Sequence, residues 1–167
     1  MNVSLPIIVA LLLAGSPEWQ TISPKDAGFS VSVRGQPNEK RETIKAAKGN
    51  IDIRFFSLTA IEGTYVAGLT RHPESVVTAG QDQSRLDQAR DGAVKLAKGR
   101  ISGEKTMTVE GRAAREFFIL ATETGHAVKV RLIADRNRLY QLMVVGNTRF
   151  LDSPEAVRFM DSFRLTK

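Results

Sequence analysis

Hydrophobic and polar residues alternate along most of the chain with a period of two. The first such stretch places Phe29, Val31 and Val33 on one side, with serines between them. Because successive side chains of a strand point to opposite faces, this alternation predicts strands that are buried on one face. Further strands are predicted at residues 43–48, 51–55, 64–69, 105–109, 112–120, 126–134 and 138–145.

The spacing changes to three and four residues in one internal segment. Apolar residues lie there at positions 86, 89, 93, 94 and 97, and charged residues fill most of the positions between them. This is the period of a helix with one apolar face. The pattern predicts an amphipathic helix over residues 84–98, ended by Gly99, since glycine readily adopts the backbone conformation found after a helix.

A second helix is predicted near the C-terminus. Ser153 can cap its first turn, and Pro154 has the backbone angle of a first helical position. Phe163 and Leu165 then continue the chain into a terminal strand. Because strands outnumber helices and are joined by short turns, the predicted class is α+β. We expect a central antiparallel sheet of about six or more strands, flanked by helices as an α-β-α sandwich.

The first sixteen residues carry no charged side chain, and positions 5–14 form an apolar run. A helix needs about 20 apolar residues to span a membrane, so this run is too short to do so. Its length, with Ala14 and Ser16 behind it, is typical of a secretory signal peptide. We predict a signal peptide over residues 1–16, a single domain over residues 17–167, and export to the periplasm or outside the cell. Two alternatives stay open: a buried first element of the domain, or an uncleaved leader that keeps the protein at a membrane.

Motifs at both ends of the predicted domain, and at the start of its last long strand, follow a known pattern. They are Trp19, the run Gly28-Phe29-Ser30-Val31 with Gly35 and Pro37 behind it, Arg138-Leu139-Tyr140, and the closing run Phe159-Met160-Asp161-Ser162-Phe163-Arg164-Leu165. This pattern resembles the PsbP-like (Mog/PsbP-type) superfamily of small exported bacterial proteins. The resemblance implies an antiparallel sheet with helices on its faces and a non-catalytic role in binding or assembly. The matched positions are core and turn positions, so no binding residue is transferred.

The residue types that carry catalysis and metal binding are scarce. The chain has no cysteine, which excludes disulfides, thiolate metal sites and a thiol nucleophile. Its two histidines, His72 and His126, are interpreted as surface residues. Residues 99–106 resemble a phosphate-binding loop, but one residue is missing between the glycines and Glu104 stands in the place of the lysine. We therefore predict no catalytic residue, no metal and no cofactor.

Basic residues exceed acidic ones by 24 to 18, for a formal net charge of +6. Such an excess attracts anionic partners at long range when it is concentrated on one face. The last predicted hairpin and its flanks are interpreted as this surface, made of Lys129, Arg131, Arg136, Arg138 and Arg149. The same residues can equally be the solvated side of an antiparallel sheet. Because few aromatic residues are present to stack on bases, no nucleic acid partner is expected.

These observations favour an exported, non-catalytic binding or assembly domain whose partner is an unidentified protein or an anionic macromolecule or surface. One alternative is a hydrolase-type enzyme that uses dispersed carboxylates or His126 in a cleft on the sheet. Another is a structural component of the cell envelope that binds no small ligand. A deep polar pocket with a carboxylate within hydrogen-bond reach of His126 would favour the enzyme.

Overall fold

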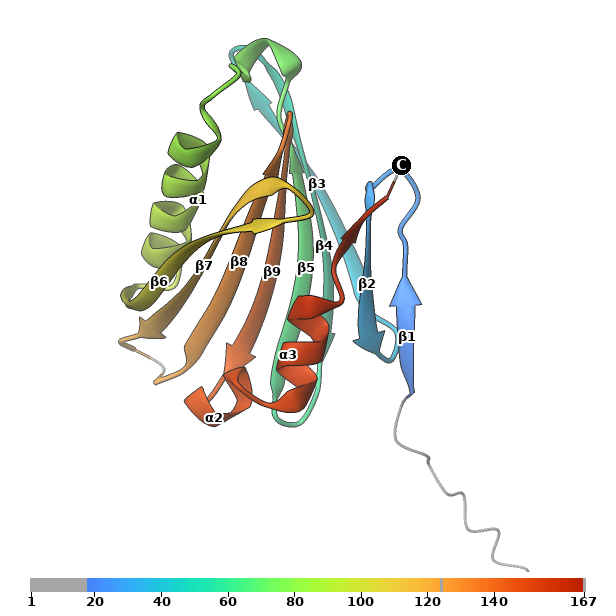
Figure 1. Ribbon diagram of the computed structural model, residues 1–167, viewed down its shortest axis with the longest axis vertical. Coiled ribbons are helices and arrows are strands. Elements are labelled where there is room, and N and C mark those ends of the chain that lie inside the picture. The colour runs from blue at the N-terminus through green and yellow to red at the C-terminus, as the bar shows by residue number, and fades with distance from the viewer. Residues whose placement is uncertain (1–17, 124, 167) are drawn as a thin grey trace, which may run out of the picture.

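The computed structural model describes residues 18–123 and 125–166 (Figure 1). Its main element is a seven-stranded antiparallel sheet with the strand order β3-β4-β5-β9-β8-β7-β6. Two runs of consecutive hairpins, β3 to β5 and β6 to β9, meet where β5 pairs with β9. The strands are β3 (Asn38–Ala46), β4 (Gly49–Thr59), β5 (Gly63–Arg71), β6 (Gly99–Val109), β7 (Arg112–Ala121), β8 (Ala127–Asp135) and β9 (Arg138–Gly146).

A second, three-stranded sheet packs against one face of the large sheet. Its strands are β1 (Trp19–Ile22), β2 (Phe29–Arg34) and β10 (Arg164–Leu165), and β2 lies in the middle. The apolar residues of β2 that the alternation singles out are all buried. This small sheet brings together the two ends of the described chain (Figure 1).

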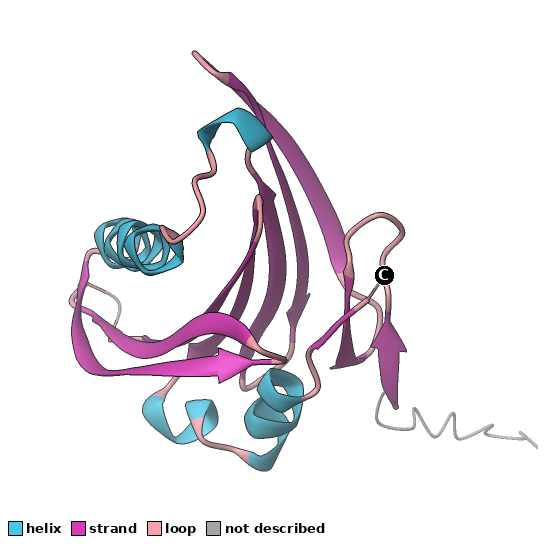
Figure 2. Ribbon diagram, turned by 45° about the horizontal axis from the view of Figure 1, so that its top comes forward, coloured by secondary structure: helices cyan, strands magenta, loops and turns pink. Residues whose placement is uncertain are grey.

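The helices lie on both faces of the large sheet. Helix α1 (Asp82–Leu96) packs on β6, β7 and β8, inside the curve of the sheet (Figure 2). Helices α2 (Thr148–Leu151) and α3 (Pro154–Asp161) lie outside that curve, on the side of the small sheet. A short 3-10 helix, η1 (Glu74–Val76), precedes α1. Ser153 caps α3 as predicted, since its Oγ accepts a hydrogen bond of 3.1 Å from the backbone nitrogen of Ala156.

Aromatic side chains hold the small sheet on the large one. The ring of Phe29 lies 5.7 Å from each of the rings of Tyr140 and Phe163, measured between centroids. The Tyr140 hydroxyl donates a 3.2 Å hydrogen bond to the carbonyl oxygen of Gly28. Burial of three aromatic rings in one cluster is a large apolar contribution to stability, and their edge and offset contacts add to it. The main core therefore lies between the two sheets.

The predicted α+β class, with an antiparallel sheet flanked by helices, is confirmed. The helix predicted over residues 84–98 is α1, which begins two residues earlier. Strand β1 and helix α2 were not predicted. Each has only four residues, too few to show the repeating spacing of apolar residues. The strand predicted at residues 43–48 is β3, which begins earlier, at Asn38. Every residue of β3 is exposed, so no alternation of buried and exposed positions indicates where it starts.

The leader predicted over residues 1–16 lies outside the described residues. Within the described part of the chain, no helix is long and apolar enough to cross a membrane.

Candidate ligand-binding groove

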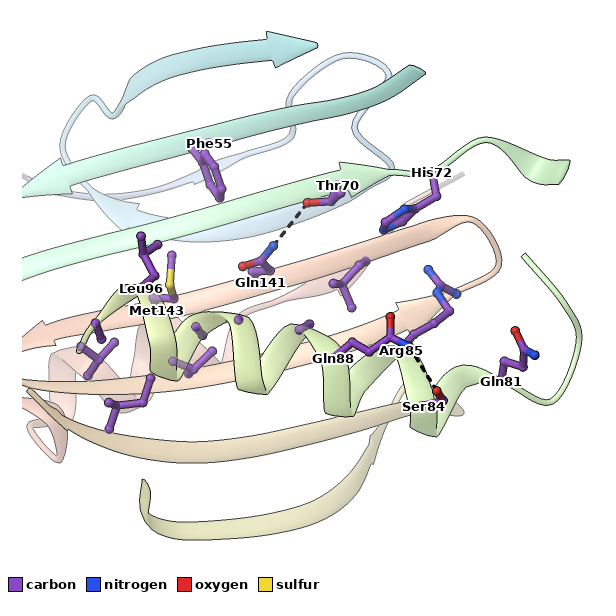
Figure 3. Close-up of a pocket in the computed structure, with 18 of the residues that line it drawn as sticks. Phe55, Thr70, His72, Gln81, Ser84, Arg85, Gln88, Leu96, Gln141 and Met143 are labelled. Carbon is purple, nitrogen blue, oxygen red and sulfur yellow. Dashed lines mark hydrogen bonds between the residues drawn. The ribbon is translucent and has the colours of Figure 1, made fainter. Parts of the chain in front are cut away.

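One helix is too narrow to cover the sheet face on which it lies. Seven strands at a spacing of about 4.8 Å form a sheet roughly 29 Å wide, whereas a helix with its side chains is about 10–12 Å across. Helix α1 packs on β6 to β8, where its Leu86 is completely buried. None of the helices in residues 18–123 and 125–166 covers the adjoining face of β4, β5 and β9 in this way, and a groove lies between that face and α1 (Figure 3).

The floor and the far wall of this groove are apolar. Val128 and Val130 of β8 and Met143 and Val145 of β9 line the floor, and Phe55 of β4 lies opposite the helix. These side chains come from alternate positions of their strands, so one face of the sheet supplies them all. The groove has a volume of about 770 Å³, within the range of about 300–1,000 Å³ that small-molecule sites occupy.

The helix contributes mainly short side chains to the groove. Ala89, Gly92 and Ala93 of α1, and Ala97 directly after the helix, line the wall, and none of these short side chains reaches far toward the sheet. Leu96 also lines it and is 88% exposed. Because small residues occupy these positions of the helix wall, the space beside this part of α1 stays open.

Polar side chains gather toward the end of the groove where α1 begins (Figure 3). The Gln141 side-chain amide donates a 3.3 Å hydrogen bond to the Thr70 hydroxyl, across the pairing of β9 with β5. On the helix, the Gln88 side-chain amide donates to the Ser84 hydroxyl at 3.4 Å. This end of the groove can therefore hydrogen-bond a ligand, whereas the remainder cannot.

Arg85 brings a positive charge to the polar end. Its guanidinium donates to the carbonyl oxygens of Arg136 and Arg138, which flank the turn between β8 and β9. One carboxylate oxygen of Asp82 lies 3.5 Å from the same guanidinium. Arg85 thus ties the first turn of α1 to the sheet and also lines the groove.

His72 lies at the same end, directly after β5 (Figure 3). Its backbone nitrogen donates to the Asn137 carbonyl at 2.8 Å, and its own carbonyl accepts from the Asn137 side chain at 3.0 Å. Burial and the charge of Arg85 lower the pKa of His72 below its usual 6.5, so the ring is neutral at pH 7. His72, interpreted from the sequence as a surface residue, is half-buried and lines the groove.

The groove is not equipped as the hydrolase alternative requires. Among its described lining residues there is no aspartate or glutamate, and His126 is not one of them. Acid–base catalysis by paired carboxylates, or by a histidine oriented by a carboxylate, needs such a group within hydrogen-bond reach. In the described segments, no three His, Asp or Glu residues are grouped so that they could hold a metal ion.

The five basic residues predicted as an anionic-partner surface do not share one exposed face. Lys129 and Arg131 are each 9% exposed and lie on the sheet face that α2 and α3 cover. Arg131 is 2.6 Å from a carboxylate oxygen of Glu116, and Lys129 is 3.3 Å from one of Asp152. The predicted alternation with the valines of β8 is present, but the basic side is covered instead of solvated. Both side chains are therefore largely covered and already paired with carboxylates.

The other three members of the set lie at two ends of the hairpin. Arg136 and Arg138 flank the β8–β9 turn and line a second pocket together with Arg112. Arg149 is in α2, which follows the opposite end of β9. An anion-binding role for the exposed members stays a prediction.

Sequence reasoning missed the groove, although it identified the helix wall and part of the floor. The helical period predicts the apolar face of α1, and the strand alternation predicts the valines of β8, but neither pattern shows the space between them. One available signal was the ratio of predicted strands to helices, since a single long helix cannot cover so wide a sheet. A second was the row of alanine and glycine on that helix.

No protein-family model matches the chain, and no curated protein matches its sequence. Among solved structures, the solution structure of cyanobacterial PsbP (CyanoP) from Synechocystis sp. PCC 6803 is similar, with a TM-score of 0.59. The similarity covers 91% of this chain and 95% of CyanoP, at 12% sequence identity. The chain has a PsbP-like fold.

The PsbP-like resemblance predicted from the sequence motifs is thereby confirmed for the fold. At this low identity the likeness extends to the fold alone. A crystal structure of PA94, a Pseudomonas aeruginosa protein of unknown function, has a TM-score of 0.39 and 11% identity. The similarity covers 66% of this chain and 85% of PA94, and it is too weak to support an argument.

Proposed function

We propose that this PsbP-like chain is an exported, non-catalytic binding domain that holds an apolar ligand in the groove beside α1. The observation that carries the proposal is the groove itself. It has a volume of about 770 Å³, an apolar floor, polar side chains at one end and no carboxylate among its described lining residues. A groove of this volume, with an apolar lining and a few polar groups at one end, has the size and character of small-molecule sites.

The energetics of such a ligand are favourable. Each methylene group that moves from water into the groove contributes about 0.8 kcal/mol. A ligand that buries about eight of them gains roughly 6 kcal/mol before the cost of association is subtracted. Hydrogen bonds at the polar end would then set the orientation of the ligand, because the apolar floor is not directional.

Binding of Nile red, a neutral apolar dye, tests the proposal. Met143→Trp places a large ring over the groove floor and should weaken dye binding at least about tenfold. Met143→Leu conserves the volume of the side chain and should leave binding unchanged. Circular dichroism and thermal unfolding establish that both variants are folded. If Met143→Trp binds the dye as tightly as the wild type, the ligand is held elsewhere.

The export part of the proposal is supported by the uncharged, apolar composition of residues 1–16. Mass spectrometry of the protein from its native host tests it. The expected mature chain begins at Pro17. A mature chain that retains residues 1–16 would contradict cleavage.

A second candidate function, binding of an anionic surface, is favoured by the pocket beside the β8–β9 turn. Arg112, Arg136 and Arg138 line this pocket of about 680 Å³, together with Glu74 and Asp135. Binding to phosphatidylglycerol vesicles should weaken as salt is added and should fall in Arg136→Asn, a residue type that tolerates the φ of 52° found there. Arg149→Asn, at the other end of the hairpin, is the matched control. Vesicle binding that salt does not change would contradict this candidate.

A further inference from the structure

The groove changes from apolar to polar along its length. Met143 and Leu96 lie together at one end, and His72, Arg85 and Ser84 lie at the other (Figure 3). A ligand that satisfies both ends must itself be apolar over most of its length and polar at one terminus. An evenly polar or evenly apolar ligand would leave one end of the groove unmatched.

The charge at the polar end is positive and only weakly compensated. Among the described residues that line the groove, Arg85 is the only one that is always charged. Its side chain is 13% exposed. Its hydrogen bonds to the carbonyl oxygens of Arg136 and Arg138 satisfy donors but leave the formal charge in place. The carboxylate nearest to it, that of Asp82, is 3.5 Å away and 44% exposed.

The groups around Arg85 are suited to an anion. Ser84 and Gln88 present a hydroxyl and an amide from the helix, and both lie in the groove lining. The pKa of His72 is lowered by burial and by Arg85, so its neutral ring can donate one hydrogen bond. Hydrogen bonds from a cation to a carboxylate are shorter and stronger than those between neutral groups. A cationic head group would instead be repelled by Arg85.

The length of the groove favours a chain over a compact molecule. Lining residues extend from Gln81 to Ala97, which is the whole of α1. At a rise of 1.5 Å per residue, a 15-residue helix is about 22 Å long. The apolar part, from Ala89 onward, runs beside β8 and β9 for about half of that distance.

We infer that the ligand of this groove is a single-chain amphiphile with an anionic head, of the fatty-acid type. Its hydrocarbon chain lies along Val130, Met143 and Val145, and its carboxylate is received by Arg85. The inference rests on the proposed function and adds to it the chemical class and the orientation of the ligand.

Three amphiphiles with the same chain and different heads test the inference: laurate, dodecanol and dodecylammonium. Each is titrated below its micelle concentration or, for dodecanol, below its solubility limit, and its dissociation constant is measured by displacement of Nile red. Laurate should bind at least about tenfold more tightly than dodecanol, and dodecylammonium more weakly than dodecanol. A parallel titration with vesicles of the same fatty acid shows whether the protein binds the free amphiphile or a membrane surface.

Variants of one helix assign the preference to Arg85. Arg85→Gln should remove the advantage of laurate over dodecanol by weakening laurate binding at least about tenfold. Arg90→Gln is the matched control, since this residue loses the same charge from α1 but pairs with Asp87, Asp91 and Glu104 away from the groove. Arg85→Lys keeps the charge and should keep the preference for laurate, which covers the case in which the glutamine variant does not fold.

The outcomes separate the inference from the proposed function. If laurate and dodecanol bind equally well to the wild type, the inference of an anionic head group is wrong, while the proposal of an apolar ligand in the groove is still supported. If neither displaces Nile red, the proposed function fails as well. If the protein binds only vesicles and no free amphiphile, the ligand is a surface and the inference is overturned.

Discussion

Glu116 and Arg131 form an ion pair between β7 and β8, on the sheet face that α3 covers. Their side chains are 4% and 11% exposed, and their closest charged atoms are 2.6 Å apart. Lys105 approaches the other oxygen of Glu116 at 3.0 Å, and Arg131 also donates to the carbonyl oxygen of Met160 at 2.8 Å. A buried charge that loses its partner is strongly destabilising, so each member of this group depends on the others.

We predict that Glu116→Gln lowers the free energy of unfolding by about 3 kcal/mol, because it removes the closest counter-charge of the buried Arg131 and leaves only the more exposed Asp161, at 3.0 Å, beside it. The measurement is a denaturant titration at pH 7. Glu123→Gln is the control, since Glu123 pairs with Lys98 where both side chains are more than half exposed, and its loss should cost less than about 1 kcal/mol. Equal effects of the two substitutions would contradict this account.

The same residue predicts a pH dependence. Burial would raise the pKa of Glu116, but the hydrogen bond from Lys105 and the charge of Arg131 outweigh it, so the pKa lies below the usual 4.5. A carboxylate with a lowered folded-state pKa stabilises the fold above its unfolded-state pKa, and this stabilisation is lost as the pH falls through the folded-state value. Unfolding free energies measured from pH 6 to pH 3 should therefore fall more steeply in the wild type than in Glu116→Gln. Parallel curves would contradict the assigned pKa shift.

At this scale the sequence predicts which side of a strand a residue occupies but not what lies over that side. The alternation in β8 correctly separates Lys129 and Arg131 from the valines. Whether that side meets water depends on α2 and α3, which come from a later part of the chain. For the same reason His72, which stands alone in the sequence, could not be placed in a groove that α1 and the sheet form together.

Among the secondary-structure elements, α2 depends on two glycines that make room for its Phe150. Gly63 begins β5 and Gly146 ends β9, and the two are paired across the strands. A Cβ atom at either position would overlap the Phe150 ring, and at Gly63 it would also overlap the carbonyl oxygen of Val145. Gly92 of α1 differs, because nothing lies within 4 Å of the place that its Cβ would take.

The same substitution should therefore have opposite effects at two sites. Gly92→Ala should raise the free energy of unfolding by about 1 kcal/mol, since alanine is the better helix former and meets no obstacle. Gly63→Ala should lower it by about 1–3 kcal/mol, the usual cost of overpacking. Denaturant titration of both variants measures these changes. Stabilisation by Gly63→Ala would show that α2 packs less tightly than described.

Elements with a full period or a specific cap were predictable, and the shortest ones were not. Ser153 and Pro154 predicted the start of α3, because capping chemistry is local. Strand β1 was not predicted, because Trp19 and Ile22 are its only apolar residues and its stability comes from pairing with β2. The pairing of β1 with β2 places Trp19 opposite Arg34, and no pattern within β1 itself predicts that register.

At the scale of the whole molecule, the two faces of the large sheet are covered unequally. One face is covered by the small sheet, α2 and α3, and the other carries α1 as its long helix (Figure 2). The groove is present because α1 is narrower than the sheet face on which it lies. The sequence predicted α1, α3 and most of the strands, but the pairing of β5 with β9, which sets the width of one continuous sheet, joins segments that are far apart in the chain.

Methyl-labelled methionine offers the most direct measurement of ligand binding beside α1. Met143 lines the groove, whereas Met107 packs toward the opposite core and Met160 is 1% exposed within it. Carbon–proton NMR spectra are recorded during a titration with dodecanol, and Met143→Leu assigns the groove signal. We predict that the Met143 methyl signal shifts and saturates while those of Met107 and Met160 stay in place. An unchanged Met143 signal, or a shift centred on Met107 or Met160, would contradict the account.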